Sequence, residues 1–377
     1  MSQDDFFKEA NIAELLGLTP VSMVSDRDIW QHLVTPQVKA MLGEIVEHEL
    51  TVRENTRGDF PGDDVSNLNN HLLFGGQPGY VRFPFINSFY RTEYGALIIK
   101  RDGVKFKVFA WYGKPKAKVY ELIFKVALRD RRYDGTKRAN DTALLDYEYD
   151  DPELNHVLDI EGLPENAKSV ELSVYGFLPG SRIIDATGDQ EFHDFVENPF
   201  KFVDRPELFI SLFNRAWKSS RSPGQVGSSV PDVTKVVPQA TERFAIAQGY
   251  DYMENASSHY HVARWAETLG YLYTCQEQED AIKALGAGIE KVKASGIKLK
   301  RHQESWICVL QHLPRKFIPD EFYLDGAQWP QDNIGQENLW MYKPLSKRAI
   351  EAAQASGKVQ RGSCSQAKKS RNRKKKQ

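Results

Sequence analysis

The feature that most constrains the fold is a pair of strand-like runs joined by Asp102-Gly103. GALIIK (95–100) precedes this dipeptide and VKFKVFAW (104–111) follows it. Asp-Gly between apolar runs is a strong hairpin signal, because both central residues of such a turn need positive φ. In the second run Val104, Phe106 and Val108 alternate with lysines, which predicts one buried and one wet face. The chain therefore contains an antiparallel sheet.

Further strand-like runs extend this sheet along the chain. They are AKVYELIFKVAL (117–128), HVLDI (156–160) and KSVELSVYG (168–176). The polar, charged stretch at 129–146 between them is expected to be a surface loop. Together these segments predict a central antiparallel β domain over residues 80–205.

The N-terminal residues 1–79 show helical spacing instead. We expect helices at 5–17, 28–57 and 63–74, with Thr35-Pro36 suited to an N-cap and first turn inside the second segment. Apolar residues three and four apart form a stripe on the second and third helices, interleaved with charged residues. The stripe consists of Val38, Met41, Leu42, Ile45, Val46, Leu50, Val65, Leu68 and Leu72.

Helices are expected to return over residues 206–357. Their ranges are 207–217, about 239–255, 258–275, 277–294, 301–312 and 345–355. The Ser-, Gly- and Pro-rich stretch 218–238 is expected to be a flexible linker. Residues 358–377 are predicted to be a disordered basic tail. The fold class is therefore α+β, with helical, β and helical domains in that order.

Charge divides the chain into an acidic body and a basic tail. The formal net charge is −1, but nine of the 50 basic residues lie between Lys358 and Gln377 with no acidic residue among them. Such a tail contacts nuclear import receptors or nucleic acid, or only improves solubility. Its densest residues are Lys368, Lys369, Arg371, Arg373, Lys374, Lys375 and Lys376.

The cellular class follows from what the sequence lacks. No run approaches the roughly 18–20 apolar residues of a membrane span. The acidic start MSQDDFFKEA does not resemble a signal peptide, and three widely spaced cysteines form no disulfide framework or zinc motif. We therefore expect a protein of a reducing compartment that is not secreted.

Two groups of residues could support catalysis. His259 and His261 are two apart at the start of a helix-like segment, where they do not share a face, so a turn is favoured over a metal site. A dense acidic run is favoured as a solvated loop over a general acid–base site. It comprises Asp146, Glu148, Asp150, Asp151 and Glu153. Without a phosphate-loop, dinucleotide, hydrolase or zincin motif, we expect no enzyme, cofactor or metal.

The short–long–short helix pattern of the first 83 residues resembles a histone fold. It is most similar to the H4-like fold of the TATA-binding-protein-associated factors of the subunit 6 type, shared by TFIID and SAGA. DFFKEANIAELLGLTPVS resembles the opening helix of that family, and DIWQHLVTPQVKAMLGEIVEHELTVRENTR its long helix. The resemblance implies an Arg57–Asp64 pair that pins the second loop to the third helix. Pro36 inside the long helix is a departure from the pattern.

The resemblance implies a nuclear scaffold subunit of a transcription initiation or co-activator complex. Its partners would be an H3-like histone-fold protein of the subunit 9 type, other subunits and, without sequence specificity, DNA. The apolar stripe would be covered by the histone-fold partner, or alternatively by the chain's own sheet. Two other functions stay open from sequence: a nucleic-acid-packaging or capsid-like binding protein, and an enzyme with a site around His259 and His261.

Overall fold

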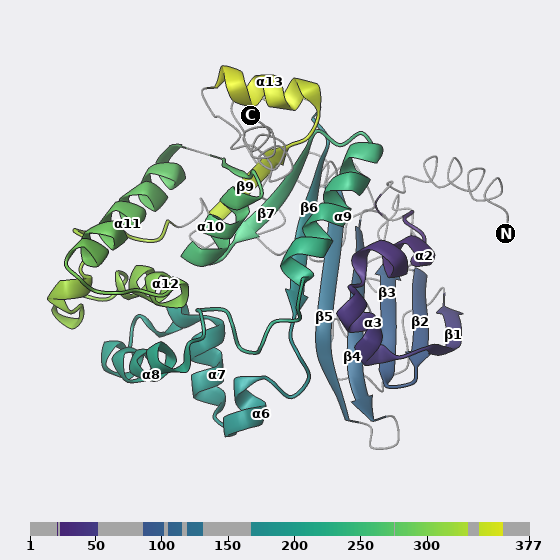
Figure 1. Ribbon diagram of the computed structural model, residues 1–377, viewed down its shortest axis with the longest axis horizontal. Coiled ribbons are helices and arrows are strands. Elements are labelled where there is room, and N and C mark those ends of the chain that lie inside the picture. The colour runs from purple at the N-terminus through teal and green to yellow at the C-terminus, as the bar shows by residue number, and fades with distance from the viewer. Residues whose placement is uncertain are drawn as a thin grey trace, which may run out of the picture. The chain divides into compact units, whose positions relative to one another are not determined.

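The chain forms a mixed α+β fold, which confirms the expected class (Figure 1). The computed structural model describes residues 21, 23–51, 86–101, 105–114, 119–130, 167–274, 276–330 and 339–356. The chain divides into two compact units. Unit 1 comprises Met1–Val157, Glu165–Pro179 and Ser229–Met253, and unit 2 comprises Leu158–Pro164, Gly180–Ser228 and Glu254–Gln377.

Unit 1 is built on an antiparallel meander of strands. Each strand pairs with the next along the chain, from β1 to β6. The bounds are β1 Ile45–Thr51, β2 Ile86–Thr92, β3 Gly95–Arg101, β4 Lys105–Lys114, β5 Val119–Asp130 and β6 Ser169–Gly176. The strands predicted around residues 95–100, 104–111, 117–128 and 168–176 are thereby confirmed.

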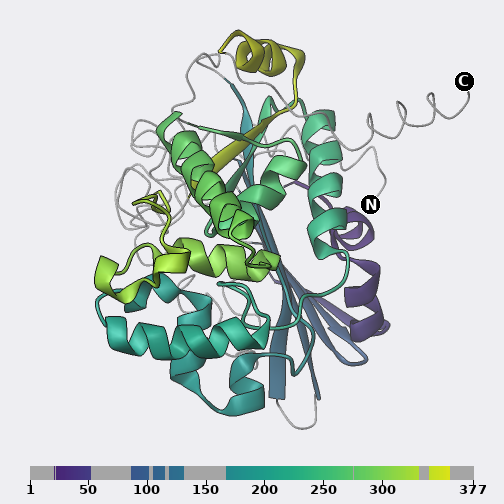
Figure 2. The same cartoon turned by 60° about the vertical axis from the view of Figure 1, so that its left-hand side comes forward.

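Helices cover one face of this meander (Figures 1 and 2). They are α2 (Asp26–Asp28), the π-helical turn η1 (Ile29–Leu33), α3 (Pro36–Leu42) and α9 (Val233–Ala247), of which α3 packs on β4 and α9 on β6 and η1. The sheet residues beneath them include Leu97, Ile99, Val108 and Val126, all at most 1% exposed. Burial of these large aliphatic side chains, worth about 1.5–3 kcal/mol each, holds the helical layer on the sheet.

Asp26 anchors the start of this helical layer to the sheet. The Tyr90 hydroxyl on β2 donates to Asp26 Oδ2 over 2.6 Å, and Arg101 on β3 forms an ion pair with the same carboxylate. Arg101 also donates to the Val24 carbonyl over 2.7 Å. Burial, followed by the hydrogen bond to Asp26, raises the pKa of Tyr90, so the phenol stays protonated and donating.

The helix expected over 28–57 is wrong, because the chain turns into a strand after Gly43. Thr35 caps α3 by accepting from the Val38 amide over 3.4 Å, as expected from Thr35-Pro36. Gly43 then adopts φ 74°, where a side chain would be strained, and an added Cβ would lie 2.4 Å from Glu93 Oε2. Residues 45–51 pair with β2 instead of continuing the helix.

Unit 2 is mainly helical. Its helices are α6 (Ile183–Thr187), α7 (Gln190–Glu197), η5 (Pro199–Phe202), α8 (Pro206–Ser219), α10 (Tyr260–Thr268), α11 (Gln276–Ala294), α12 (Arg301–Leu310), η6 (Arg315–Phe317), η7 (Asp320–Phe322) and α13 (Lys347–Ala355). The last segment of the unit begins at Glu254, within β7 (Tyr252–Ser257). One neighbour of β7 is β9 (Leu339–Pro344), which pairs antiparallel with β8 (Leu272–Tyr273).

Aromatic side chains form the core of unit 2. The Phe195 ring of α7 stacks on Trp306 of α12 at a centroid distance of 5.3 Å and meets Phe209 of α8 edge-on at 5.1 Å. The Trp306 indole donates to the Arg221 carbonyl over 2.7 Å, so its polar nitrogen is satisfied. These contacts join α7, α8 and α12 into one layer.

The helices expected in this region are confirmed in part. Those at 207–217, 277–294, 301–312 and 345–355 correspond to α8, α11, α12 and α13. Those at 239–255 and 258–275 are too long, since β7 and β8 occupy their C-terminal ends.

The linker expected over 218–238 is wrong, because its residues are held in place. Val226 and Val230 are buried, and the Gly224 amide donates to the Val196 carbonyl over 2.6 Å. From Val233 onward the stretch belongs to α9, which includes Pro238. Burial of the valines among the serines and glycines fixes this stretch in place.

Candidate functional site

The sheet face opposite the helices in unit 1 carries a group of cations, which we call the basic face. Side chains of directly paired residues lie on the same side of a sheet, so the register assigns them to one face. Arg91 pairs with Ala96, Lys100 with Lys107, Lys107 with Ala127, and Lys125 with Phe109. The basic face consists of Arg91, Lys100, Lys107, Lys125 and Arg129.

The outer cations of the basic face form ion pairs. Arg91 Nε lies 3.4 Å from Glu47 Oε2 on β1, and Arg129 Nη1 lies 3.5 Å from Glu171 Oε2 on β6. The side chains of the Arg91–Glu47 pair are more exposed, so this pair contributes at most about 1 kcal/mol. The lysines are concentrated between these two outer pairs.

The three lysines of the basic face lie close together. Lys100 and Lys107 are direct partners across β3 and β4, a position at which like charges repel. The Lys100 and Lys125 ammonium groups lie 5.1 and 5.4 Å from the centroid of the Phe109 ring. Lys100 is 7% exposed, whereas Lys107 and Lys125 are half-buried. We call Lys100, Lys107 and Lys125 the lysine cluster.

A buried cluster of mainly aromatic residues shares the sheet face with these cations. Phe89, Ile98, Phe109 and Trp111 form one buried cluster, with no member more than 5% exposed. The Phe109 ring attracts the ammonium groups of Lys100 and Lys125, at about 0.5–1 kcal/mol or more per contact. Such an arrangement concentrates positive charge at fixed positions and suits an anionic ligand.

His259 and His261 lie in a buried part of unit 2. The Nδ1 atom of His259 lies 2.9 Å from the Ser258 hydroxyl, and that of His261 lies 2.9 Å from the Ser305 hydroxyl. The His259 ring stacks on Phe200. Burial, with a smaller contribution from His261, lowers the pKa of His259 to about 3.

Burial likewise lowers the pKa of His261, to about 4. Both rings are therefore neutral at physiological pH, and their centroids are 6.1 Å apart. His259 is the N-cap residue of α10, which agrees with the predicted turn at the start of this helix.

A cluster that the sequence reasoning missed lies on α7. His193, Asp194 and Glu197 each offer a ligand atom, and these atoms lie within 4.8 Å of one another. The spacing of four between His193 and Glu197 places both on one helix face and was visible in the sequence.

The residues predicted to bind a histone-fold partner do not form one helical stripe. Val38 and Leu42 of α3 are fully buried within the structure, and Met41 is half-buried. Ile45 and Val46 are 42% and 61% exposed, but they belong to β1. The predicted residues are divided between a helix and a strand because α3 ends at Leu42. The prediction of a continuous helical apolar stripe is therefore wrong over residues 38–46.

Several other predicted site residues lie outside the described part of the chain. They are Val65, Leu68, Leu72, Arg57, Asp64, the acidic run at 146–153 and the basic tail at 358–377. Leu50 is in β1, and its side chain is outside the described part as well. Their roles stay predictions.

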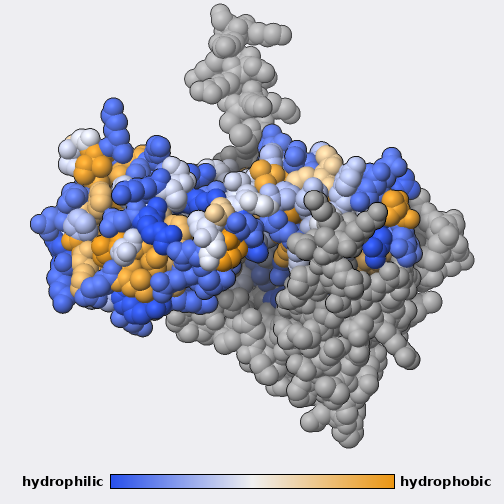
Figure 3. All heavy atoms as spheres, turned by 90° about the horizontal axis from the view of Figure 1, so that it is seen from below, coloured by the Kyte–Doolittle hydropathy of each residue, from blue (hydrophilic) through white to orange (hydrophobic). Residues whose placement is uncertain are grey.

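On the face seen in Figure 3, hydrophilic residues are interspersed among the hydrophobic ones over the described surface. None of the described helices combines the length and the apolarity that a membrane crossing needs. No family model, curated protein or solved structure matches this chain.

Proposed function

We propose that this chain is a nucleic-acid-binding protein that contacts phosphates through the basic face of unit 1. The observation that carries the proposal is the lysine cluster, in which two lysines are direct cross-strand partners and a third lies over the same phenyl ring. Lysines grouped on one face of a sheet make that face attractive to a polyanion.

The chemistry of the face favours phosphate contact over base recognition. The aromatic rings of the face are buried, so they are not positioned to stack on bases. Lysine ammonium groups bind phosphate as point charges and carry no sequence information. The proposal is therefore binding without sequence preference, driven by release of counterions and weakened by salt.

The transcription-scaffold hypothesis depends on one long apolar helix that needs a second polypeptide, whereas the chain buries Val38 and Leu42 itself. The nucleic-acid hypothesis depends on the sheet domain and on the basic tail. The basic face is the part of the sheet that supports it.

The proposal is tested by measuring binding of a fluorescein-labelled single-stranded oligonucleotide at several salt concentrations. The double substitution Lys107→Gln and Lys125→Gln removes two charges from half-buried positions. We expect an affinity about tenfold lower at low salt. The slope of log affinity against log salt should fall by about 1.4, because each phosphate contact to a single strand contributes about 0.7.

Two matched proteins separate this face from other sources of positive charge. Lys283→Gln with Lys291→Gln removes the same charge from α11, where both lysines are exposed and paired with carboxylates. A truncation that removes residues 358–377 isolates the tail. Equal losses in the face variant and the α11 variant, or complete loss of binding on truncation, would refute the proposed role of the basic face.

A further inference from the structure

The strongest remaining feature is the His193, Asp194 and Glu197 cluster on α7, which is independent of the basic face. His193 Nδ1 lies 3.3 Å from Asp194 Oδ1. A carboxylate oxygen of Glu197 lies within 4.8 Å of one ligand atom of His193 and one of Asp194. Ligands that bind a metal at about 2.0–2.2 Å in neighbouring positions are about 3.0–3.5 Å apart. The first distance already matches, and Glu197 is exposed and can close the second by rotating.

The environment of His193 fixes which nitrogen faces the cluster. Its side chain is only 8% exposed, and Nδ1 is directed at the carboxylate of Asp194. The buried Nε2 atom has no hydrogen-bond partner among the described residues. Nδ1 is therefore the nitrogen that an ion held by the cluster would reach.

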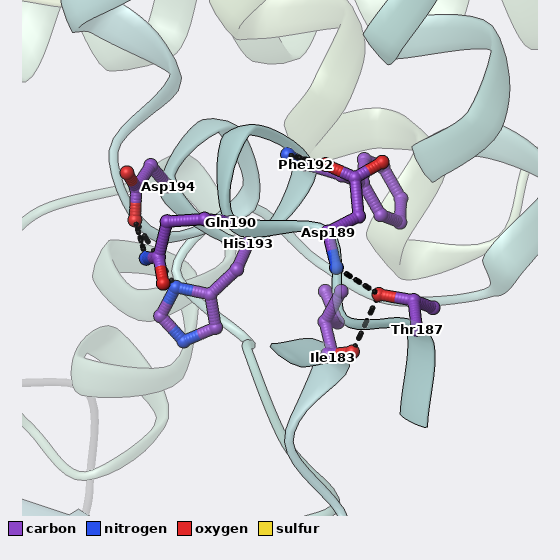
Figure 4. Close-up of polar contacts among 7 residues, drawn as sticks. All are labelled: Ile183, Thr187, Asp189, Gln190, Phe192, His193 and Asp194. Carbon is purple, nitrogen blue, oxygen red and sulfur yellow. Dashed lines mark hydrogen bonds and ion pairs between the residues drawn. The ribbon is translucent and has the colours of Figure 1, made fainter. Parts of the chain in front are cut away.

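The helix that carries the cluster is fixed at its N-terminus (Figure 4). Asp189 caps it by accepting from the Phe192 amide over 2.9 Å, and Arg215 of α8 donates to Asp189 over 2.8 Å. Thr187 accepts from the Asp189 amide over 3.1 Å and donates to the Ile183 carbonyl. The helix can therefore hold its side chains in position before any ion arrives.

Gln190 orients the first carboxylate of the cluster. Its side-chain amide donates to Asp194 Oδ1 over 2.6 Å, as Figure 4 shows. Amide donors of this kind typically position metal-binding carboxylates from outside the coordination shell. The partial exposure of Asp194 and Glu197 leaves the outer side of the cluster to water.

We propose that His193, Asp194 and Glu197 bind one divalent transition-metal ion, Mn²⁺ or Zn²⁺. One imidazole with two carboxylates suits these two ions better than Ca²⁺ or Mg²⁺, which prefer all-oxygen sites. The ion would bind the lone pair of Nδ1 and leave the imidazole proton on Nε2. Water would complete the coordination, and the ion would offset the repulsion between the two neighbouring carboxylates.

The test is titration of the full chain with Mn²⁺, followed by electron paramagnetic resonance of the free ion, and with Zn²⁺ by calorimetry. The variants Asp194→Asn and Glu197→Gln change exposed or half-exposed side chains and should leave the fold intact. Each should weaken the tightest site at least tenfold. His193→Gln should do the same, and circular dichroism checks that it folds.

Glu191→Gln is the matched control, because Glu191 is an exposed carboxylate on the same helix that pairs with Arg205 at 3.8 Å. It should bind either ion within twofold of the unmodified chain. Unchanged affinity in Asp194→Asn and Glu197→Gln would overturn the proposal. Failure of the unmodified chain to bind both Mn²⁺ and Zn²⁺ would overturn it as well. Equal weakening in Glu191→Gln would also overturn it, since it would indicate a general charge effect.

Discussion

Acid should destabilise unit 2 through His259, and the size of the effect follows from burial. The folded state keeps this imidazole neutral, with a pKa of about 3, whereas an unfolded chain has a histidine pKa of 6.5. Below pH 6.5 the unfolded state therefore binds a proton that the folded state does not. Stability is retained above pH 6.5 and lost progressively as the pH falls toward 3.

The expected loss at pH 5.0 is about 2 kcal/mol from this one residue. Each pH unit in that window is worth about 1.4 kcal/mol per proton, and pH 5.0 lies about 1.5 units below the unfolded pKa. Since His259 is only 4% exposed, solvent screening reduces this value little. The comparison between two pH values isolates the proton linkage from other costs.

The substitution His259→Phe removes the titration and keeps a flat ring against Phe200. Ser258, which loses its partner at Nδ1, is exposed and can bond to water. Urea unfolding at pH 7.5 and 5.0, followed by tryptophan fluorescence, gives the drop in unfolding free energy for each protein. The drop in the variant should be smaller by about 2 kcal/mol. An equal drop in both proteins would refute the burial argument, whatever the variant's own stability.

Three further outcomes are expected. Gly95→Ala should cost about 3 kcal/mol in urea unfolding, because its Cβ would lie 1.9 Å from the Trp111 carbonyl oxygen; wild-type stability would contradict the tight β3–β4 approach. Asp26→Ala should lower the free energy of unfolding by about 2 kcal/mol, since the Arg101 side chain is 10% exposed and would lose its ion pair. An unchanged free energy of unfolding in the same assay would show that this ion pair does not stabilise the fold. Cys308, with a buried thiol and a raised pKa, should react with iodoacetamide at least about a hundredfold more slowly in the folded chain than in urea, as peptide mass spectrometry would show; similar rates would contradict its burial.

The elements that could be predicted are those whose signals are local. Asp102-Gly103 and the lysine alternation after it identified two strands of the meander, and the burial of Phe106 and Val108 agrees with the predicted buried face. The face predicted to be wet is wrong in part, because Phe109 and Trp111 on the side of Lys107 are buried as well. Thr35-Pro36 likewise identified the start of α3. Each of these signals lies within a few residues of the element that it specifies.

The segment after Leu42 shows why local spacing was insufficient. Ile45, Val46 and Leu50 fit a helical stripe with the residues before them, yet the chain follows the strand alternative. The choice depends on partners far along the chain: the His48 ring stacks on Tyr90 at 4.3 Å, and Glu47 pairs with Arg91. Sequence spacing contains no information about such partners.

The candidate sites were hidden for a related reason. Lys100, Lys107 and Lys125 are scattered over three strands, and only the register between those strands brings them together. The α7 cluster, in contrast, needs no long-range pairing. The spacing of four between His193 and Glu197 is visible in the sequence, although the burial of His193 is not.

The position of two lysines over Phe109 also provides a built-in spectroscopic reporter. Protons held over the face of a phenyl ring resonate upfield in a nuclear magnetic resonance spectrum, because the circulating π electrons shield them. The ε-methylenes of Lys100 and Lys125 lie next to ammonium groups 5.1 and 5.4 Å from the ring centroid, so their signals should be displaced from the crowded lysine region. An anion that draws either ammonium group away from the ring would return its signal toward that region, which would reveal occupancy one side chain at a time.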